Sequence, residues 1–148
     1  MTKDEPRVIK GGLGIDDRGE VGFVNDFDFQ NVKRFYTLKN YRAGFVRAWH
    51  GHKKEGKFLH VTKGSAIIAA VQIDNWESPS KDLPIARYVL SEKQPSVLFI
   101  PAGYANGTMS LEDDTRIIIF STSTLDESKG DDFRFHGRYW NPWEVEER

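Results

Sequence analysis

The sequence predicts an all-β protein of the sandwich or barrel class, with little helix. Many short runs are rich in Val, Ile, Phe, Tyr or Thr, the residues that favour pleated strands. Turn residues separate these runs at intervals of roughly 8–12 residues, which is typical of sandwiches and barrels. No window keeps an apolar stripe of helical period for long enough to predict a long helix.

The predicted strands follow one another along almost the whole chain. The segments 75–84 and 125–132 are expected to be loops, the second of them acidic and solvated. The tail from Trp140 to Arg148 is expected to pack through its two tryptophans and then to fray. The runs predicted as strands are 8–10, 22–27, 32–38, 45–50, 57–61, 65–72, 86–90, 96–100, 107–110 and 116–122.

Length and composition exclude several classes of protein. The 148 residues predict one domain, 1–148, with enough chain for a full hydrophobic core. The formal charge of −1 gives no global field that would attract nucleic acid or an anionic membrane. Without cysteine, the chain has no disulfide, thiolate nucleophile or cysteine-ligated metal. Residues 1–7 are polar, so neither a signal peptide nor a membrane span is expected, and the predicted location is cytoplasmic.

Two motifs carry a resemblance to a known superfamily. The spacing Gly-x5-His-x-His runs from Gly44 through His50 to His52, and the motif closes at Gly64. A Pro-x-Gly-x-x-Asn segment follows at 101–106. In this order they resemble the two motifs of the cupins, which are double-sheet jelly rolls. The resemblance implies a single-domain cupin jelly roll, a double-stranded β-helix sandwich.

The motifs depart from those of metal-binding cupins at two ligand positions. Lys57 stands where those proteins have a glutamate, and Asn106 stands where they have a third histidine. A lysine ammonium has no lone pair for a cation and repels it. Two histidines are fewer than the three protein ligands usual at catalytic zinc. We therefore expect no metal, although Glu55 could substitute as a ligand if the local backbone differed.

Histidine and lysine in one pocket indicate proton transfer next to a carbonyl group. A neutral histidine has a pKa near ~6.5 and acts well as a general base at cellular pH. A neighbouring ammonium stabilises the enolate oxygen that develops when the proton leaves. This pairing predicts enolisation chemistry in a pocket that contains His50, His52 and Lys57. The substrate supplies its own activating carbonyl, so no organic cofactor is expected.

The segment Arg47-Ala-Trp-His50-Gly-His52 resembles the Arg-Gly-Leu-His segment of the dTDP-4-dehydrorhamnose 3,5-epimerases. The resemblance places His50 at the family's base and Arg47 at its substrate-contacting arginine. Asp16-Asp17-Arg18-Gly19 is similar to an early family element whose arginine contacts the nucleotide diphosphate. Lys57 matches a lysine that faces the sugar.

The resemblance implies a nucleotide-linked 4-keto-6-deoxy sugar as substrate, epimerised at C3, C5 or both. It also implies a homodimer paired through an N-terminal strand, and a role in deoxysugar or O-antigen-type polysaccharide biosynthesis. Two alternatives stay open. The segment Arg47 to Lys53 is closer to the Arg-Gly-x-His-Ala-His-Lys of the sugar 3,4-ketoisomerases, in which two histidines move a proton between C3 and C4. A non-catalytic cupin that binds sugar or nucleotide is the other.

The acid that completes the reaction is not evident from the sequence. The epimerases use a tyrosine just after the last core strand, but the corresponding segment 120–125 has none. His52 and Tyr104 are the candidate acids, and Asn106 is a candidate substrate contact. The carboxylate that orients the family's base lies in a C-terminal region that this chain lacks, so Asp131 or Asp132 is the candidate replacement.

Strand alternation adds a condition on the site. Arg47 and His50 are three residues apart, so a regular strand would point them to opposite faces. Both can line one pocket only if a bulge breaks the ladder between them. Lys57 and His60 are also three residues apart, and His60 is therefore expected outside the pocket.

Overall fold

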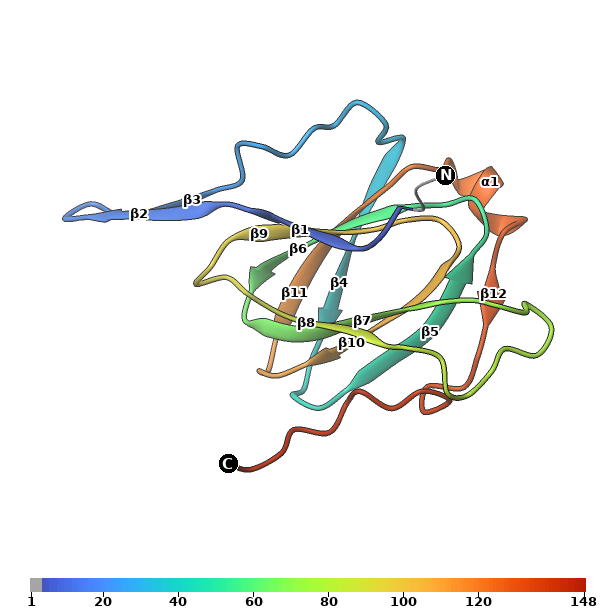
Figure 1. Cartoon of the computed structure of the whole chain (residues 1–148). Helices are drawn as coiled ribbons and strands as arrows, with labels where there is room; N and C mark the ends of the chain where they lie inside the picture. The colour runs from blue at the N-terminus through green and yellow to red at the C-terminus, as the bar shows by residue number, and fades with distance from the viewer. Residues whose placement is uncertain (1–3) are drawn as a thin grey trace.

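The computed structural model describes residues 4–148, so the first three residues of the segment 1–7 lie outside it. Two five-stranded antiparallel sheets face each other, and a separate two-stranded hairpin projects from them (Figure 1). The first sheet has the order β1-β9-β6-β11-β4 and the second the order β12-β5-β10-β7-β8. This is the jelly-roll sandwich that the sequence predicts.

Most strand predictions are confirmed with small changes of bounds. The first sheet contains β1 (Arg7–Lys10), β4 (Arg34–Asn40), β6 (Lys57–Lys63), β9 (Ser96–Ile100) and β11 (Thr115–Ser121). The second contains β5 (Val46–His52), β7 (Ser65–Gln72), β8 (Ala86–Ser91), β10 (Tyr104–Ser110) and β12 (Phe133–Arg134). The hairpin consists of β2 (Gly12–Asp16) and β3 (Gly19–Phe23). One short helix, α1 (Leu125–Lys129), precedes β12.

Three local predictions are wrong. The hairpin strand β2 was not predicted, because Gly12 and Gly14 lower its strand propensity. The segment 125–132 begins with α1 and is not a loop throughout, because Thr124 and Glu127 form a capping box that starts the helix. The strand predicted at 107–110 begins three residues earlier, so Asn106 lies inside β10.

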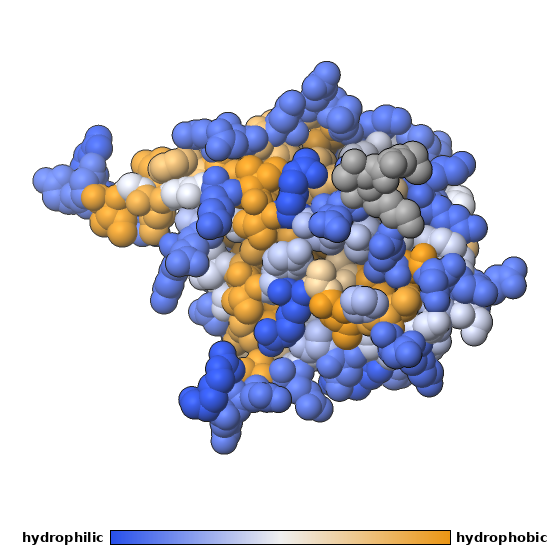
Figure 2. All heavy atoms as spheres, in the orientation of Figure 1, coloured by the Kyte–Doolittle hydropathy of each residue, from blue (hydrophilic) through white to orange (hydrophobic). Residues whose placement is uncertain are grey.

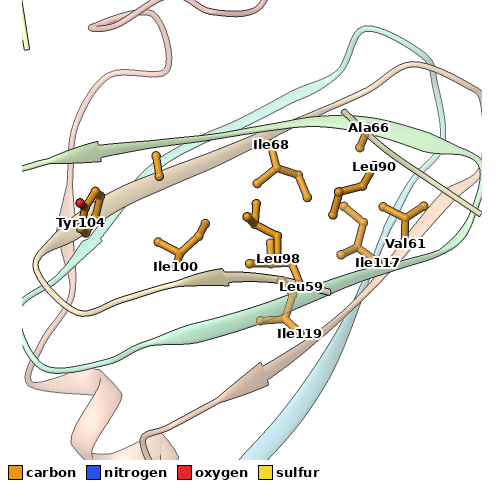
Figure 3. Packing of buried hydrophobic residues seen from close by; sticks show 11 residues of the cluster. Leu59, Val61, Ala66, Ile68, Leu90, Leu98, Ile100, Tyr104, Ile117 and Ile119 are labelled. Carbon is orange, nitrogen blue, oxygen red and sulfur yellow. The ribbon is translucent and has the colours of Figure 1, made fainter. Parts of the chain in front are cut away.

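Strand alternation builds two hydrophobic clusters. Between the sheets, Leu59, Ile68, Leu98 and Ile117 belong to a buried cluster that extends to Tyr104 at one end (Figure 3). The opposite face of the second sheet is covered by the C-terminal segment. As predicted for the tail, Trp140 and Trp143 are packed there, and Trp49 of β5 is buried with them. Strand β7 is buried on both faces because it contributes alternate residues to each cluster.

The closing glycine of the first motif has a steric reason. Gly64 has a φ of +79°, and a Cβ on it would lie 2.4 Å from Thr115 Oγ1. Only glycine fits this tight connection, which joins β6 of the first sheet to β7 of the second.

No helix in the part of the chain that the structure describes is both long and apolar enough to span a membrane.

Candidate active site

A cavity of about 460 Å³ lies where the two sheets face each other. Its walls come from β4, β5, β6, β10 and β11, with α1 and the segment that leads into β12 at one side. The residues predicted from the motifs converge on it. Arg47, His50, His52, Lys57 and Asn106 all line this one cavity.

A bulge in β5 brings Arg47 and His50 to the same cavity. Asn106 pairs with His50 across the β5–β10 ladder, but Thr108 pairs with Arg47, so β5 holds one extra residue in this interval. The break reverses the alternation, and both side chains line the cavity. The bulge that the sequence required is therefore confirmed. Arg47 is held by its Nε, which donates to Asn40 Oδ1 at 2.6 Å, and its two terminal nitrogens are not used in this bond.

His50 is a neutral imidazole at physiological pH. Burial, the Lys57 ammonium and the Arg134 guanidinium together lower the pKa of His50 to about 4, although Asp132 opposes them. No hydrogen bond holds the His50 ring within residues 4–148. Asn106 Nδ2 donates instead to the His50 carbonyl oxygen at 3.2 Å, which fixes the backbone. His50 is thus a free base that faces the cavity.

His52 is more tightly held. Its Nδ1 lies 2.6 Å from the carbonyl oxygen of Asp131. A carbonyl oxygen can only accept, so Nδ1 carries the proton and Nε2 has the lone pair. Burial and the nearby Lys57 lower the pKa of His52, so the ring is neutral and Nε2 is an acceptor. His52 must gain a proton before it can serve as an acid.

Lys57 is buried, with 7% of its surface exposed. Burial lowers the pKa of Lys57, and the carboxylate of Glu55 opposes this effect most strongly. Among residues 4–148, no carboxylate oxygen lies within 4.0 Å of Lys57 Nζ. The ammonium is therefore available to an oxygen of a bound molecule. His60 lies outside the cavity, as alternation predicts, and its Nδ1 contacts the Ser96 carbonyl at 2.8 Å.

Three predicted residues are not brought to the base. Tyr104 lines a different cavity, with Gln72 and Tyr88, and forms one end of the buried cluster (Figure 3). The Asp131 carboxylate accepts from the backbone nitrogens of the turn after β5, at 2.8–3.1 Å, and does not bond His50. Arg18 lies at the tip of the projecting hairpin, where its side chain is 85% exposed and paired with Asp16. Of the two candidate carboxylates, only Asp132 lines the cavity, and it pairs with Arg134 at 3.2 Å.

The structure adds residues that the motifs did not indicate. Tyr36 and Arg34 line the cavity from β4, Thr108 from β10, and Ser128 and Lys129 from α1. Two signals could have found them. Arg34, Tyr36 and Leu38 alternate along a predicted strand and so share a face. The Thr124-x-x-Glu127 box predicts a helix start.

Unsatisfied polar atoms gather in this cavity. Within residues 4–148, three buried side-chain atoms have no hydrogen-bond partner: Arg34 Nε, His52 Nε2 and Thr108 Oγ1. All three residues line the cavity. Buried polar groups in folded proteins are almost always paired with protein or ordered water, so unpaired groups around one cavity indicate that water or a polar ligand binds there. The charged side chains that line the cavity are mostly cationic: Arg34, Arg47, Lys57, Lys129 and Arg134 are the five cations, and Asp132 is the one acid. This excess of positive charge favours an anionic ligand.

No metal cluster is evident in the structure. Within the described chain, no three His, Cys, Asp or Glu side chains lie close enough to hold a metal ion. Glu55, the candidate substitute ligand, instead accepts hydrogen bonds from Ser121 Oγ and Ser128 Oγ.

Fold and site together define a cupin whose cavity presents histidine, lysine and arginine to an anionic ligand. The chain matches the model of the dTDP-4-dehydrorhamnose 3,5-epimerase family over residues 22–136, and it belongs to this family of isomerases. No curated protein sequence is significantly similar to it.

Solved structures agree with this assignment. A dTDP-4-dehydrorhamnose 3,5-epimerase from Sulfolobus tokodaii is 25% identical, with a TM-score of 0.73 over 92% of this chain and 80% of that one. A 3′-monoepimerase from Streptomyces bikiniensis, solved with dTDP, is 12% identical, with a TM-score of 0.75 over 97% and 77%. A TDP-quinovose 3,4-ketoisomerase from Campylobacter jejuni is 16% identical, with a TM-score of 0.65 over 90% and 95%. At these lower identities the last two show the shared fold.

Proposed function

We propose that the protein epimerises a nucleotide-linked 4-keto-6-deoxy sugar at C3, C5 or both. The observation that carries the proposal is the set of unpaired polar atoms around a cavity that also holds a neutral histidine and a free lysine. The family and the S. tokodaii epimerase support the choice of substrate.

His50 takes the proton from the carbon next to the ketone. The C–H electron pair becomes the C=C bond of an enolate, and the ketone oxygen becomes an oxyanion. Lys57, with Arg47, stabilises that oxyanion through charge and hydrogen bonds. The neutral state of His50 at pH 7 prepares it for this step, because only the unprotonated ring can accept the proton.

Inversion requires a proton from the opposite side of the sugar ring. His50 lies on β5 of the second sheet, and Tyr36 lies on β4 of the first sheet, so they line the cavity from facing sheets. Burial, reinforced by the negative charge of Glu55, raises the pKa of Tyr36 to about 12. The hydroxyl therefore keeps its proton until the enolate draws it. We assign Tyr36 as the acid in place of Tyr104, which lines the other cavity.

The cationic side chains bind the diphosphate. Arg34, Arg134 and Lys129 lie around the α1 side of the cavity, and Asn106 is kept as a sugar contact. Bidentate guanidinium groups suit phosphate oxygens.

Arg18 reaches a substrate only if a second copy of the chain is present. The hairpin that holds it projects away from the sandwich (Figure 1), and it carries exposed apolar side chains. Figure 2 shows this arm as largely hydrophobic, with a hydrophilic tip. Ile15 is 72% exposed and Val21 68%. An apolar arm of this kind suits burial against a partner, so the proposal includes a homodimer in which Arg18 serves the partner's cavity. The cytoplasmic location and the biosynthetic role stay predictions of the resemblance.

A 3,4-ketoisomerase is the second candidate. The specific observation in its favour is that His52 lines the same cavity as His50, two residues away on the same strand. In that reaction C3 loses a proton and C4 gains one, while the hydroxyl at C3 loses its proton and the oxygen at C4 gains one, so that the ketone moves from C4 to C3.

Proton NMR of nucleotide 4-keto-6-deoxy sugars in D2O with the enzyme tests both candidates. Deuterium at C3 or C5 with the 4-ketone retained supports the epimerase and names the carbon. A ketone that moves to C3 supports the ketoisomerase. Tight binding without any exchange contradicts both and leaves a binding protein.

A further inference from the structure

A buried carboxylate that the proposed reaction does not use lies directly behind the cavity. Glu55 is 2% exposed. Its carboxylate accepts from Ser121 Oγ at 2.9 Å and from Ser128 Oγ. Of the cationic groups in the described chain, only His52 Nδ1 comes within 4.0 Å, at 3.8 Å, and that ring is neutral. Burying an acid without an ion-pair partner is costly, so its position requires an explanation.

The backbone around Glu55 is held firmly. Glu55 lies in the short turn between β5 and β6, three residues after His52 and two before Lys57. The Asp131 carboxylate accepts from the backbone nitrogen of Glu55 at 3.1 Å, and Gly56 N donates to Thr122 Oγ1 at 2.8 Å. These bonds fix where the turn sits, and the two serines fix where the carboxylate points.

Lys57 needs a negative charge nearby. Other titratable or charged side chains line the cavity together with Lys57, and only one of them is a carboxylic acid, Asp132. They include Arg34 and Tyr36 of β4, His50 and His52 of β5, Asp132 just before β12, and Arg134 within it. Burial and the two arginines favour the neutral amine, which could not stabilise an oxyanion. Glu55 is placed beside Lys57 by Ser121, whose Oγ donates to the Glu55 carboxylate and which is the residue paired with Lys57 across the β6–β11 ladder. The charges of Glu55 and Asp132 oppose the loss of the Lys57 proton, and Glu55 has the larger effect. Asp132 is exposed and already paired with Arg134.

We propose that Glu55 is a positioning residue whose buried carboxylate serves as the fixed negative charge for the Lys57 ammonium. The bond from Ser128 also ties this charge to α1, which lines the cavity. This inference rests on the proposed function only where it predicts a change in catalytic activity. The predicted change in the pKa of Lys57 does not depend on the proposed function.

The test is Glu55→Gln, which removes the charge, nearly keeps the volume, and leaves an amide oxygen to accept from one serine while the amide nitrogen donates to the hydroxyl oxygen of the other. The pKa of Lys57 is followed by ¹³C NMR of its Cε in wild type and variant. It is expected to fall by about 1 unit or more, because an opposite charge close to an ionisable group shifts its pKa by that order. Activity requires the ammonium, so the rate of substrate deuterium exchange falls at high pH, where Lys57 loses its proton. In the variant, this alkaline limb of the pH profile moves to lower pH by as much as the pKa of Lys57 falls. Below that limb, the variant keeps its rate within about threefold.

Glu77→Gln is the matched control, because Glu77 is exposed and outside the cavity. It is expected to leave both the pKa of Lys57 and the pH profile unchanged. An unchanged pKa of Lys57 in Glu55→Gln overturns the inference. A uniform loss of rate with the alkaline limb in place also overturns it, since that is the result of a merely structural role.

The two proposals fail in different ways. If the pKa of Lys57 falls but wild-type protein exchanges no proton of any nucleotide sugar, the inference stands and the proposed function is wrong. If Glu55→Gln does not fold, Glu55→Asp carries the test, since it withdraws the charge by one methylene. A smaller fall in the pKa of Lys57 then supports the inference, and no change overturns it.

Discussion

At the scale of single residues, one extra position in β5 decides the chemistry. Without the bulge between Arg47 and His50, strand alternation would turn one of them away from the cavity. With it, the guanidinium of Arg47 and the neutral imidazole of His50 line the same space. The reactivity of the site thus depends on a local irregularity as much as on residue type.

We expect His50→Asn to abolish proton exchange. Loss of a positioned general base lowers rates by about 10²–10⁴-fold. Affinity for the nucleotide diphosphate should stay within about threefold, because the cations that bind it are unchanged. Deuterium uptake by NMR and calorimetric titration with the nucleotide measure the two effects. His136→Asn, which alters an exposed histidine, is the control. Unaltered exchange in His50→Asn would show that the base is another group.

The pH dependence of kcat/KM follows from the pKa of His50. This pKa is about 4 in the folded protein, below the ordinary value of 6.5, because burial and nearby cations disfavour the charged ring. The base works only when unprotonated, so kcat/KM should be flat from pH 7 to about 5 and fall as the pH drops through 4. Rates measured in buffers of constant ionic strength test this. An acid limb near pH 6.5 would contradict the assigned environment of His50.

Tyr36→Phe separates proton removal from inversion. We expect deuterium exchange at the carbon beside the ketone to continue, because His50 still removes and returns the proton. Formation of the epimer should fall by about 10²-fold or more, since the hydroxyl that supplies the other face is gone. NMR reports both quantities in one sample. Tyr41→Phe, at an exposed tyrosine, is the control. Equal loss of exchange and epimerisation would argue against Tyr36 as the acid.

At the scale of elements, the turn between β5 and β6 is held by a residue far away in the sequence. The Asp131 carboxylate accepts from the backbone nitrogens of Lys53, Lys54 and Glu55, and its carbonyl accepts from His52. One buried aspartate after α1 therefore sets the position of the turn, of Glu55 and of the second histidine.

We expect Asp131→Ala to lower the free energy of unfolding by about 3 kcal/mol, because it leaves three backbone donors without their charged acceptor. Urea denaturation measures the change. Asp126→Ala, an exposed acid in the first turn of α1, is the control and should cost under about 1 kcal/mol. A loss for Asp131→Ala no larger than that of the control would contradict the role of Asp131 in the turn.

Strand β10 shows what the alternation of side chains along a strand predicts and what it does not. The β10 motif places Asn106 opposite His50, and both reach the cavity as expected. Tyr104 is opposite His52 on the same ladder, yet it packs into the core cluster and lines the other cavity. Alternation predicts the face of a strand, but the packing of the facing sheet decides what each side chain on that face meets.

At the scale of the whole molecule, the hairpin of β2 and β3 lies outside the sandwich, and its apolar side chains Ile15 and Val21 are exposed. Its strands pair only with each other. Apolar side chains point from both of its faces, since Ile15 lies opposite Glu20 and Val21 opposite Gly14. A two-stranded hairpin is marginally stable alone, so a second copy is the partner that the proposal supplies.

We expect the double variant Ile15→Asp, Val21→Asp to convert a dimer into a monomer, because charges on both faces oppose burial of the arm. Light scattering coupled to gel filtration measures the mass. Glu20→Gln, on the same arm, should leave the dimer intact. A wild-type protein that is monomeric at micromolar concentration would remove both the dimer and the anchoring role of Arg18.

The sequence by itself determined the class of fold, the order of the two motifs and the main candidate residues that the structure brings into one cavity. These follow from local patterns: strand runs and turn residues, and the motif spacing that places Arg47 and His50 on one predicted strand and Lys57 on the next strand along the chain. Only the tertiary structure decided that Tyr36 lines the same cavity as His50 from the other sheet, that α1 lines it, and that Tyr104 belongs to another cavity. Those relations join residues from opposite sheets, and they depend on how the sheets pack and where a bulge shifts their register, which no local pattern encodes.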